Sequence, residues 1–200
     1  MLTDAILVIG AYLLGSISSA IIVCKIMGQP DPRTLGSNNP GATNVLRYAG
    51  KKAAAFTLSG DVLKGLTPVL IATLFSSDAR IIAAVAFAAF IGHLYPLFFG
   101  FRGGKGVATA FGVLLGLSWL VGLAVLATWL VVARLFHTSS LSAIAASLLT
   151  PLYLWLFMAQ PAYLVMGLAM STLLIWRHRS NIRNLIRGEE GGIGNDAEDE

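Results

Sequence analysis

The sequence predicts an all-α integral membrane protein, a polytopic helical bundle, and three observations carry that prediction. Hydrophobic residues make up 56% of the 200-residue chain and charged residues only 12%, whereas a soluble domain carries about 25% charged residues. Long apolar runs recur along the chain, and the Lys and Arg residues gather in the polar segments between them. A bilayer is therefore the expected main solvent, and the bilayer lipids are the expected surroundings of the chain.

Each helix is expected where a run approaches the roughly 20 apolar residues that cross a hydrocarbon core. Residues 5–24, 53–75, 81–101 and 107–133 meet this requirement. The first run has no Lys or Arg before it and no small-residue cleavage site after it, which indicates an uncleaved span and not a signal peptide. The stretch 138–176 is uncharged, about twice the length of one span, and contains Pro151 and Pro161, so its division is ambiguous.

Sidedness follows from the cations, because short loops rich in Lys and Arg stay in the cytoplasm. Segments 25–52, 102–106 and 177–187 carry most of them. The short links 76–80 and 134–140 then fall on the opposite side. A cytoplasmic C-terminus requires an odd number of crossings, with the N-terminus outside. Five is the simplest count, and seven follows if 138–176 forms short or broken helices.

Residues 1–187 are expected to form a single transmembrane domain, followed by an acidic tail, 188–200, that is expected to be disordered. A single cysteine, Cys24, excludes an intramolecular disulfide and a thiolate metal cluster. Through residue 188 the chain has only four acidic residues, which are not clustered. We therefore predict no metal and no cofactor. The basic membrane-embedded body favours anionic lipid headgroups or phosphorylated substrates and not nucleic acid.

Three polar segments could carry chemistry, and the first spans Gly36 to Arg47. It is rich in Gly and Asn, which tolerate positive φ, and Pro40 favours a turn. The segment can therefore fold back and point N–H groups and short side chains at an anion. It is also compatible with a tight loop in which Thr43 or Asn44 caps the next helix.

The second segment, Gly100 to Gly106, directly precedes an apolar run. Its glycines permit close backbone approach to a ligand, a helix N-terminus adds partial positive charge, and Lys105 adds a full charge. This composition predicts a phosphate-binding loop. Phe99 and Gly106 stand where a Walker A loop has Gly and Ser or Thr. A flexible linker with two cationic anchors is the alternative.

The third segment, Arg177 to Arg187, follows the last apolar residue. On a helix, His178 and Asn181 share a face that looks back toward the protein, while Arg179 and Arg183 can face elsewhere. His178 is the histidine best placed for proton transfer or phosphate contact. A juxtamembrane basic helix that binds acidic lipid is the alternative.

Two features lie inside the apolar runs. Asp61 and Lys64 are three residues apart and can pair on one helix face, where intramembrane charges are functional candidates. We prefer a structural pair that braces the site. His93 could orient the glycine loop.

The motifs resemble those of the bacterial acyl-phosphate-dependent glycerol-3-phosphate acyltransferases. The resemblance rests on Gly-Ser-x-Asn-x-Gly-Ala-Thr-Asn at 36–44, His-x-Tyr-Pro at 93–96 leading into Gly-Gly-Lys-Gly at 103–106, and Arg-His-x-x-Asn-Ile at 177–182. It covers about residues 5–190. Asn38 stands where that family usually has Gly, and Ser180 replaces a common acidic residue.

The resemblance implies transfer of a fatty acyl group from acyl phosphate to the 1-hydroxyl of sn-glycerol 3-phosphate, giving lysophosphatidate and phosphate in phospholipid synthesis. It implies a multi-pass protein of the bacterial inner membrane with a cytoplasmic active site, and transient contact with the enzyme that makes acyl phosphate. The implied catalytic residues are His178, Asn181, Lys105 and Ser37. The implied substrate-binding residues are Arg47, Asn44, Thr43, Gly103, Gly104, Gly106, Lys64 and Asp61.

The expected mechanism is direct transfer without an acyl-enzyme, because the donor is already an activated anhydride and no side chain is an obvious nucleophile. The proton could go to His178 or to a substrate phosphate. A small membrane transporter or channel for an organic phosphate is the main alternative, since broken helices and glycine loops also form transport sites. It predicts access from both faces, whereas the polar motifs cluster on one.

Overall fold

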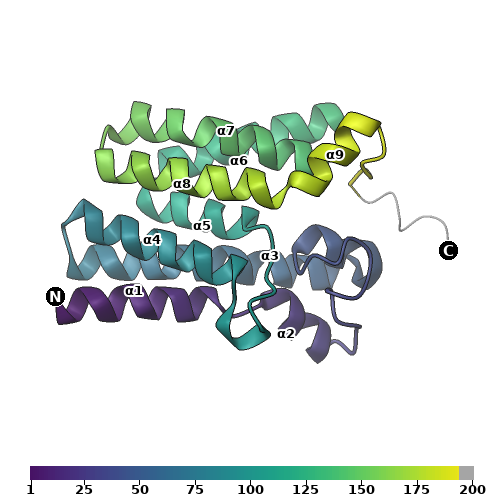
Figure 1. Cartoon of the computed structure of the whole chain (residues 1–200), viewed down its shortest axis with the longest axis horizontal. Helices are drawn as coiled ribbons and strands as arrows, with labels where there is room; N and C mark the ends of the chain where they lie inside the picture. The colour runs from purple at the N-terminus through teal and green to yellow at the C-terminus, as the bar shows by residue number, and fades with distance from the viewer. Residues whose placement is uncertain (194–200) are drawn as a thin grey trace.

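The computed structural model describes residues 1–193 and contains no β-strand in that range. Its helices lie side by side as an elongated bundle (Figure 1). They are α1 (Leu2–Gly15), α2 (Ser19–Ile26), α3 (Ala42–Phe75), α4 (Ala79–Leu94), the 3-10 turn η1 (Leu97–Phe99), α5 (Val107–Leu117), α6 (Trp119–Phe136), α7 (Ser139–Met158), α8 (Pro161–Arg177) and α9 (Arg179–Arg187). The predicted all-α membrane bundle is confirmed.

Seven helical units of this bundle run along its length. Four of them, α3, α4, α6 and α7, are long and apolar enough to cross a membrane, and α1 with α2 forms one more span bent by 43°. The shorter apolar helices α5 and α8 complete the set. Length and composition thus support up to five spans in residues 1–193, the simplest count that the sequence predicts. The N-terminus lies at one end of the bundle (Figure 1). Helices α2 and α9 lie at the other end, together with the loop that precedes α5.

The run 107–133, which we expected to be one span, is two helices. The chain reverses at Ser118, whose extended backbone ends α5 and whose side chain accepts a hydrogen bond from the Val121 N–H of α6. Hydropathy does not detect this reversal, because a single serine leaves the run apolar. The expectation that residues 134–140 lie opposite the polar motifs is therefore wrong: the Ser139 hydroxyl lies 3.1 Å from that of Thr43.

The other spans agree better with the sequence. Residues 138–176 divide into α7 and α8 at a left-handed residue, Ala159, and Pro161 occupies the first turn of α8. Proline suits that position because its missing N–H would have no helical partner there. Pro151 lies inside α7 without ending it. Two helices therefore fill the stretch that the sequence left ambiguous.

Helices α3 and α5 pack with their backbones in contact. A Cβ on Gly65 would collide with the Thr109 carbonyl, and a Cβ on Gly112 would collide with the Val62 carbonyl. Small residues at such crossings are typical of membrane helices, where close van der Waals packing replaces the hydrophobic effect. This crossing holds the short helix α5, and with it the glycine loop that precedes α5, against α3.

Candidate active site

The first polar segment forms a compact loop before α3. Asn38 has φ +55°, a left-handed backbone conformation that asparagine tolerates better than most residues. The buried Asn44 side chain accepts from the Ser37 N–H at 3.0 Å and donates to the carbonyls of Pro32 and Leu35 at 3.0 and 3.1 Å. Asn44 therefore braces the loop, while Ser37, Thr43 and Arg47 line a cavity beside it.

The glycine loop packs against the end of α4. The Gly104 N–H donates to the His93 carbonyl at 3.2 Å, and a Cβ on Gly104 would collide with the His93 ring. Arg177 donates to the Gly103 carbonyl at 2.7 Å and to the Gly104 carbonyl at 3.0 Å. His93 orients this loop, as the sequence suggested. Protein atoms thus cover the side of Gly104 from which a Cβ would project. The His93 ring requires glycine at this position, and the predicted close approach of a ligand does not.

Two features of the glycine loop do face the cavity. The cavity is lined by Lys105 and Gly106 of the loop and by the first residues of α5, Val107 and Ala108. Gly106 has φ +91° and leads directly into α5, whose first N–H groups have no intrahelical acceptors. A helix N-terminus and an ammonium group therefore meet at one point, which is an arrangement suited to a phosphate.

The third segment bends at His178, between α8 and α9, and reaches the same place. His178 is 3% exposed, and its Nδ1 lies 2.8 Å from the Leu174 carbonyl. A carbonyl only accepts, so Nδ1 carries the proton and Nε2 is left as an acceptor. Burial lowers the pKa of His178 to about 4, so the ring is neutral near pH 7. Arg179 and Arg183 are exposed, as predicted.

Convergence of the second and third segments is direct. Lys105 Nζ donates to Asn181 Oδ1 at 2.5 Å, across 76 positions of sequence. Burial lowers the pKa of Lys105 to about 8, the charge of Glu190 opposes this shift, and Arg177 and Arg47 add to it. The ammonium is therefore still mostly charged at neutral pH. Its positively charged neighbours Arg47 and Arg177 make the site favourable for an anion.

A buried ionic cluster lies behind the loops. Lys64 Nζ is 2.8 Å from Asp61 Oδ1 and donates to the Ile17 carbonyl at 2.7 Å, and His93 Nδ1 is 3.6 Å from the same carboxylate. The predicted Asp61–Lys64 pair is confirmed. Asp61 and His93 also line the cavity, whereas Lys64 points to the Ile17 carbonyl. Substrate contact by Lys64 and Asp61 stays a prediction, and the bracing contacts are the observed ones.

Sequence reasoning missed Ser139, Ser140 and Glu190. The two serines begin α7, and Glu190 lies in the predicted disordered tail; all three line the cavity. Arg47 Nη2 donates to the Gly192 carbonyl at 3.2 Å, and the Ile193 N–H donates to the His137 carbonyl at 2.9 Å. Residues 194–200, the remainder of that tail, lie outside the described residues. No composition signal in the acidic tail pointed to this location.

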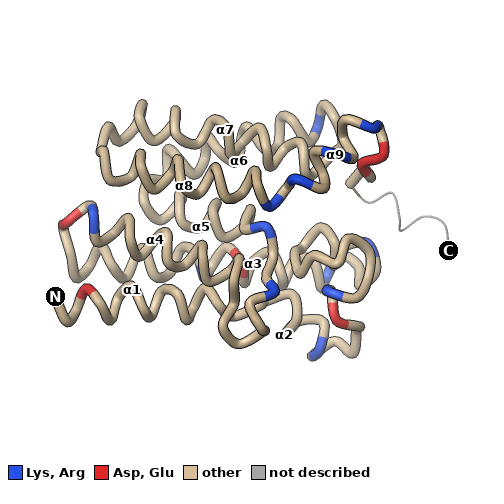
Figure 2. The backbone as a smooth tube through the Cα atoms, viewed as in Figure 1, with Lys and Arg blue, Asp and Glu red and all other residues tan. Residues whose placement is uncertain are grey.

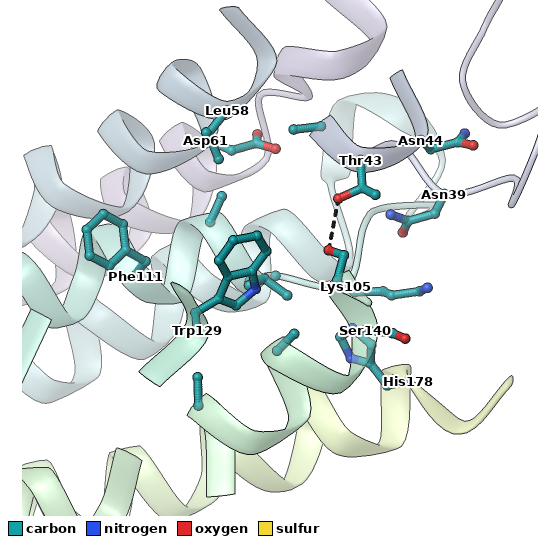
Figure 3. Close-up of a pocket in the computed structure, with 18 of the residues that line it drawn as sticks. Asn39, Thr43, Asn44, Leu58, Asp61, Lys105, Phe111, Trp129, Ser140 and His178 are labelled. Carbon is teal, nitrogen blue, oxygen red and sulfur yellow. Dashed lines mark hydrogen bonds between the residues drawn. The ribbon is translucent and has the colours of Figure 1, made fainter. Parts of the chain in front are cut away.

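The cavity has a volume of about 370 Å³ and two chemically distinct parts. Figure 3 shows Thr43, Lys105, Ser140 and His178 gathered at one end, and Phe111 and Trp129 at the other. Helices α3, α5, α6 and α7 supply the apolar part, with residues Leu58, Val62, Ala108, Phe111, Val125, Leu126, Trp129, Leu130, Ala143 and Ala146. Leu58 and Leu130 are about half exposed on the outer surface of the bundle. The cavity suits an amphiphile with an anionic head.

The chain is similar to known proteins both in sequence and in fold. The protein-family model described as glycerol-3-phosphate acyltransferase matches residues 5–188. Glycerol-3-phosphate acyltransferases of Thioalkalivibrio sulfidiphilus and Methylococcus capsulatus are each 58% identical to this chain, over 98% and 92% of it and over 96% and 93% of their own lengths.

Two crystal structures of PlsY (YgiH), an integral membrane glycerol 3-phosphate acyltransferase, have the same fold. The glycerol 3-phosphate form is 41% identical with a TM-score of 0.92 and covers 96% of each chain. The lysophosphatidic acid form is 39% identical with a TM-score of 0.90, over 98% of this chain and 97% of the other. The family model, the identity and the shared fold extend over nearly the whole sequence, and the chain therefore belongs to the glycerol-3-phosphate acyltransferase family.

Proposed function

We propose that this chain transfers a fatty acyl group from acyl phosphate to the 1-hydroxyl of sn-glycerol 3-phosphate, giving lysophosphatidate and phosphate. The observation that carries this proposal is the division of the cavity into a basic polar end and an apolar part that reaches the outer surface of the bundle. A phosphorylated polar acceptor and a donor with an acyl chain fit these two parts.

The polar end would hold the phosphates of both substrates. Lys105 and Arg47 supply full positive charges, and the N-terminus of α5 supplies partial charge. Two anionic substrates repel each other in water, and cations placed between them remove that repulsion without reorganisation during the reaction. Positioning the hydroxyl against the carbonyl then converts a bimolecular encounter into an effectively intramolecular step.

The apolar part would bind the acyl chain. Its walls come from α3, α5, α6 and α7, and Leu58 of α3 and Leu130 of α6 bring it to the surface that faces lipid. Acyl phosphate dissolved in the bilayer could then enter laterally, with its chain never leaving an apolar environment. Glycerol 3-phosphate, which is wholly polar, would enter from the aqueous end.

His178 is placed to orient the acceptor hydroxyl. Its unprotonated Nε2 can accept a hydrogen bond from the hydroxyl, while Nδ1 stays bonded to the Leu174 carbonyl. With a pKa of about 4, the ring is a weak base. A phosphate monoester dianion, whose conjugate acid has a pKa of about 6, is the stronger proton acceptor. We therefore assign the orienting role to His178 and the final proton to a substrate phosphate.

Direct transfer agrees with the contacts of Ser37, the hydroxyl that the sequence placed among the catalytic residues. Its described hydrogen bond is from the backbone N–H to Asn44, and within residues 1–193 no base is bonded to its hydroxyl. A serine nucleophile requires such a base. The anhydride donor already has an activated carbonyl and a good leaving group, so the reaction needs orientation more than covalent catalysis.

The site would face the cytoplasm of the bacterial inner membrane. Figure 2 shows most of the blue Lys and Arg segments at the end of the bundle that holds the site. Arg80 is an exception at the start of α4, and Lys64 is buried within α3. The positive-inside rule favours this orientation. It also places the cavity where an enzyme producing acyl phosphate could make transient contact.

The test is a reconstituted assay with purified protein, palmitoyl phosphate and labelled glycerol 3-phosphate. We expect labelled lysophosphatidate and one phosphate released per turnover. Use of palmitoyl-CoA in place of palmitoyl phosphate, or transport of glycerol 3-phosphate without acylation, would contradict the proposal. Incubation with labelled palmitoyl phosphate alone separately tests direct transfer, since palmitate retained on the denatured protein would reveal an acyl-enzyme.

A further inference from the structure

Glu190 returns to the site because of how α9 ends. Gly188 adopts a left-handed conformation, φ +71°, and its N–H donates to the Leu185 carbonyl. The Glu189 N–H donates to the Asn184 carbonyl at 2.8 Å. This C-cap turns the chain back along the helix. Glu190 consequently lies against the polar wall of the cavity, whereas Glu189 is exposed.

The Glu190 carboxylate joins two elements of the site. Its Oε1 accepts from the Ser140 hydroxyl of α7 and from Asn181 Nδ2 of α9, both at 2.6 Å. Hydrogen bonds to an ionised acceptor are shorter and stronger than neutral ones. The carboxylate therefore connects the start of α7 with the helix that carries Asn181.

These contacts settle which way the Asn181 amide faces. An amide has a donor side and an acceptor side. With Nδ2 bonded to the Glu190 carboxylate, Oδ1 is turned to Lys105 Nζ. The flipped amide would place N–H against the ammonium, where both groups are donors, and its oxygen against the carboxylate, where both are acceptors. An ionised carboxylate at position 190 excludes that state.

The same carboxylate balances the charge around Lys105. The groups that face this ammonium are Arg47 of α3, Arg177 and His178 at the end of α8, and Glu190 after α9. Arg47 and Arg177 oppose the charged form of Lys105, and Glu190 favours it. Glu190 thus supports both the location and the charge of Lys105.

We infer that Glu190 is a positioning residue for glycerol 3-phosphate: it holds the Asn181 amide in the orientation that places the Lys105 ammonium in the phosphate-binding end of the cavity. This inference rests on the function proposed above. It differs from a purely structural brace, because a brace would affect the amount of folded protein and not the affinity or the pH dependence of the folded fraction.

Glu190→Gln tests this inference, because it keeps the shape of the side chain but removes its charge and its acceptor-only character. Glycerol 3-phosphate binding to purified protein, measured by calorimetry without any acyl donor, should weaken by about tenfold at pH 7, the scale of one lost charge-assisted contact. The pH above which binding declines should also fall, since the carboxylate no longer favours the protonated Lys105. The apparent KM for palmitoyl phosphate should change less.

Glu189→Gln is the matched control, because Glu189 carries the same charge one position away and is exposed. We expect wild-type affinity and pH dependence. Wild-type values in Glu190→Gln would overturn the inference, as would reduced thermal stability with unchanged affinity of the folded fraction, which would show a brace only.

If Glu190→Gln does not accumulate in membranes, Glu190→Asp tests the inference in its place. It keeps the charge but withdraws the carboxylate by one methylene, so binding should weaken with the upper pH limit unchanged. Wild-type affinity in Glu190→Asp would then overturn the inference. A wild-type protein that binds glycerol 3-phosphate but does not acylate it would contradict the proposed function. The binding results for the Glu190 variants would still test the inference, because the binding assay contains no acyl donor.

Discussion

Replacing Lys105 with Met should weaken the use of glycerol 3-phosphate strongly while leaving the bundle intact. The substitution keeps most of the length of the side chain but removes its ammonium, which lies at the polar end of the cavity 2.5 Å from Asn181. The glycine loop itself keeps its bonds to His93 and Arg177, because these use backbone groups of Gly103 and Gly104. The variant therefore tests the charge and not the shape of the loop.

The expected size follows from the charge state of this group. With a pKa of about 8, Lys105 is mostly protonated at pH 7 and can make a charge-assisted hydrogen bond to phosphate. Such a bond contributes about 1.5–3 kcal/mol. The loss corresponds to about ten- to hundredfold in kcat/KM with glycerol 3-phosphate as the varied substrate. The KM for palmitoyl phosphate should change less, because the acyl chain binds elsewhere.

Initial rates with each substrate varied in turn measure this split. Arg102→Gln is the matched control: it removes an exposed cation from the same loop and should leave both KM values unchanged. If Lys105→Met inserts, folds and retains wild-type kinetics toward glycerol 3-phosphate, the loop is only a linker and the assigned phosphate site is wrong. Gly104→Ala is less informative, because its Cβ would collide with the His93 ring.

Four further predictions follow from the site and the bundle. In pH profiles of kcat/KM for glycerol 3-phosphate, activity should decline above about pH 8 as Lys105 loses its proton, and His178, with a pKa of about 4, should add no limb between about pH 5 and 9. Asp61→Asn should destabilise the protein in detergent by about 3–5 kcal/mol, because it leaves Lys64 buried without its carboxylate, and adding Lys64→Met should recover part of that loss. A cysteine introduced at His137 in a Cys24→Ala background should be labelled from the same side as cysteines in the three polar motifs, and labelling from the opposite side would contradict the reversal at Ser118. Activity should survive EDTA, and a loss restored by magnesium would contradict the proposed mechanism.

Much of the protein class and of the site is readable from the sequence. Hydropathy indicates the membrane, because transferring an uncharged 20-residue segment into lipid depends on composition alone. The Asp61–Lys64 pair follows from helical spacing, and the αL backbone of Asn38 follows from the turn chemistry of its segment. The positive-inside rule predicts that the basic segments share one side of the membrane, and the structure brings two of them together through Lys105 and Asn181.

Only the tertiary structure decided where the chain reverses and what covers each group. Hydropathy is insensitive to direction, so the reversal at Ser118 and the return of residues 134–140 to the site end left no mark in the apolar pattern. The requirement for glycine at position 104 comes from the His93 ring, eleven positions away in sequence and on another element. Glu190 reaches Ser140 and Asn181 through a C-cap turn, although its own segment looks like an acidic tail. Composition and spacing determine which solvent a segment prefers and which neighbours share its helix face, whereas contacts between distant segments depend on packing that no single segment encodes.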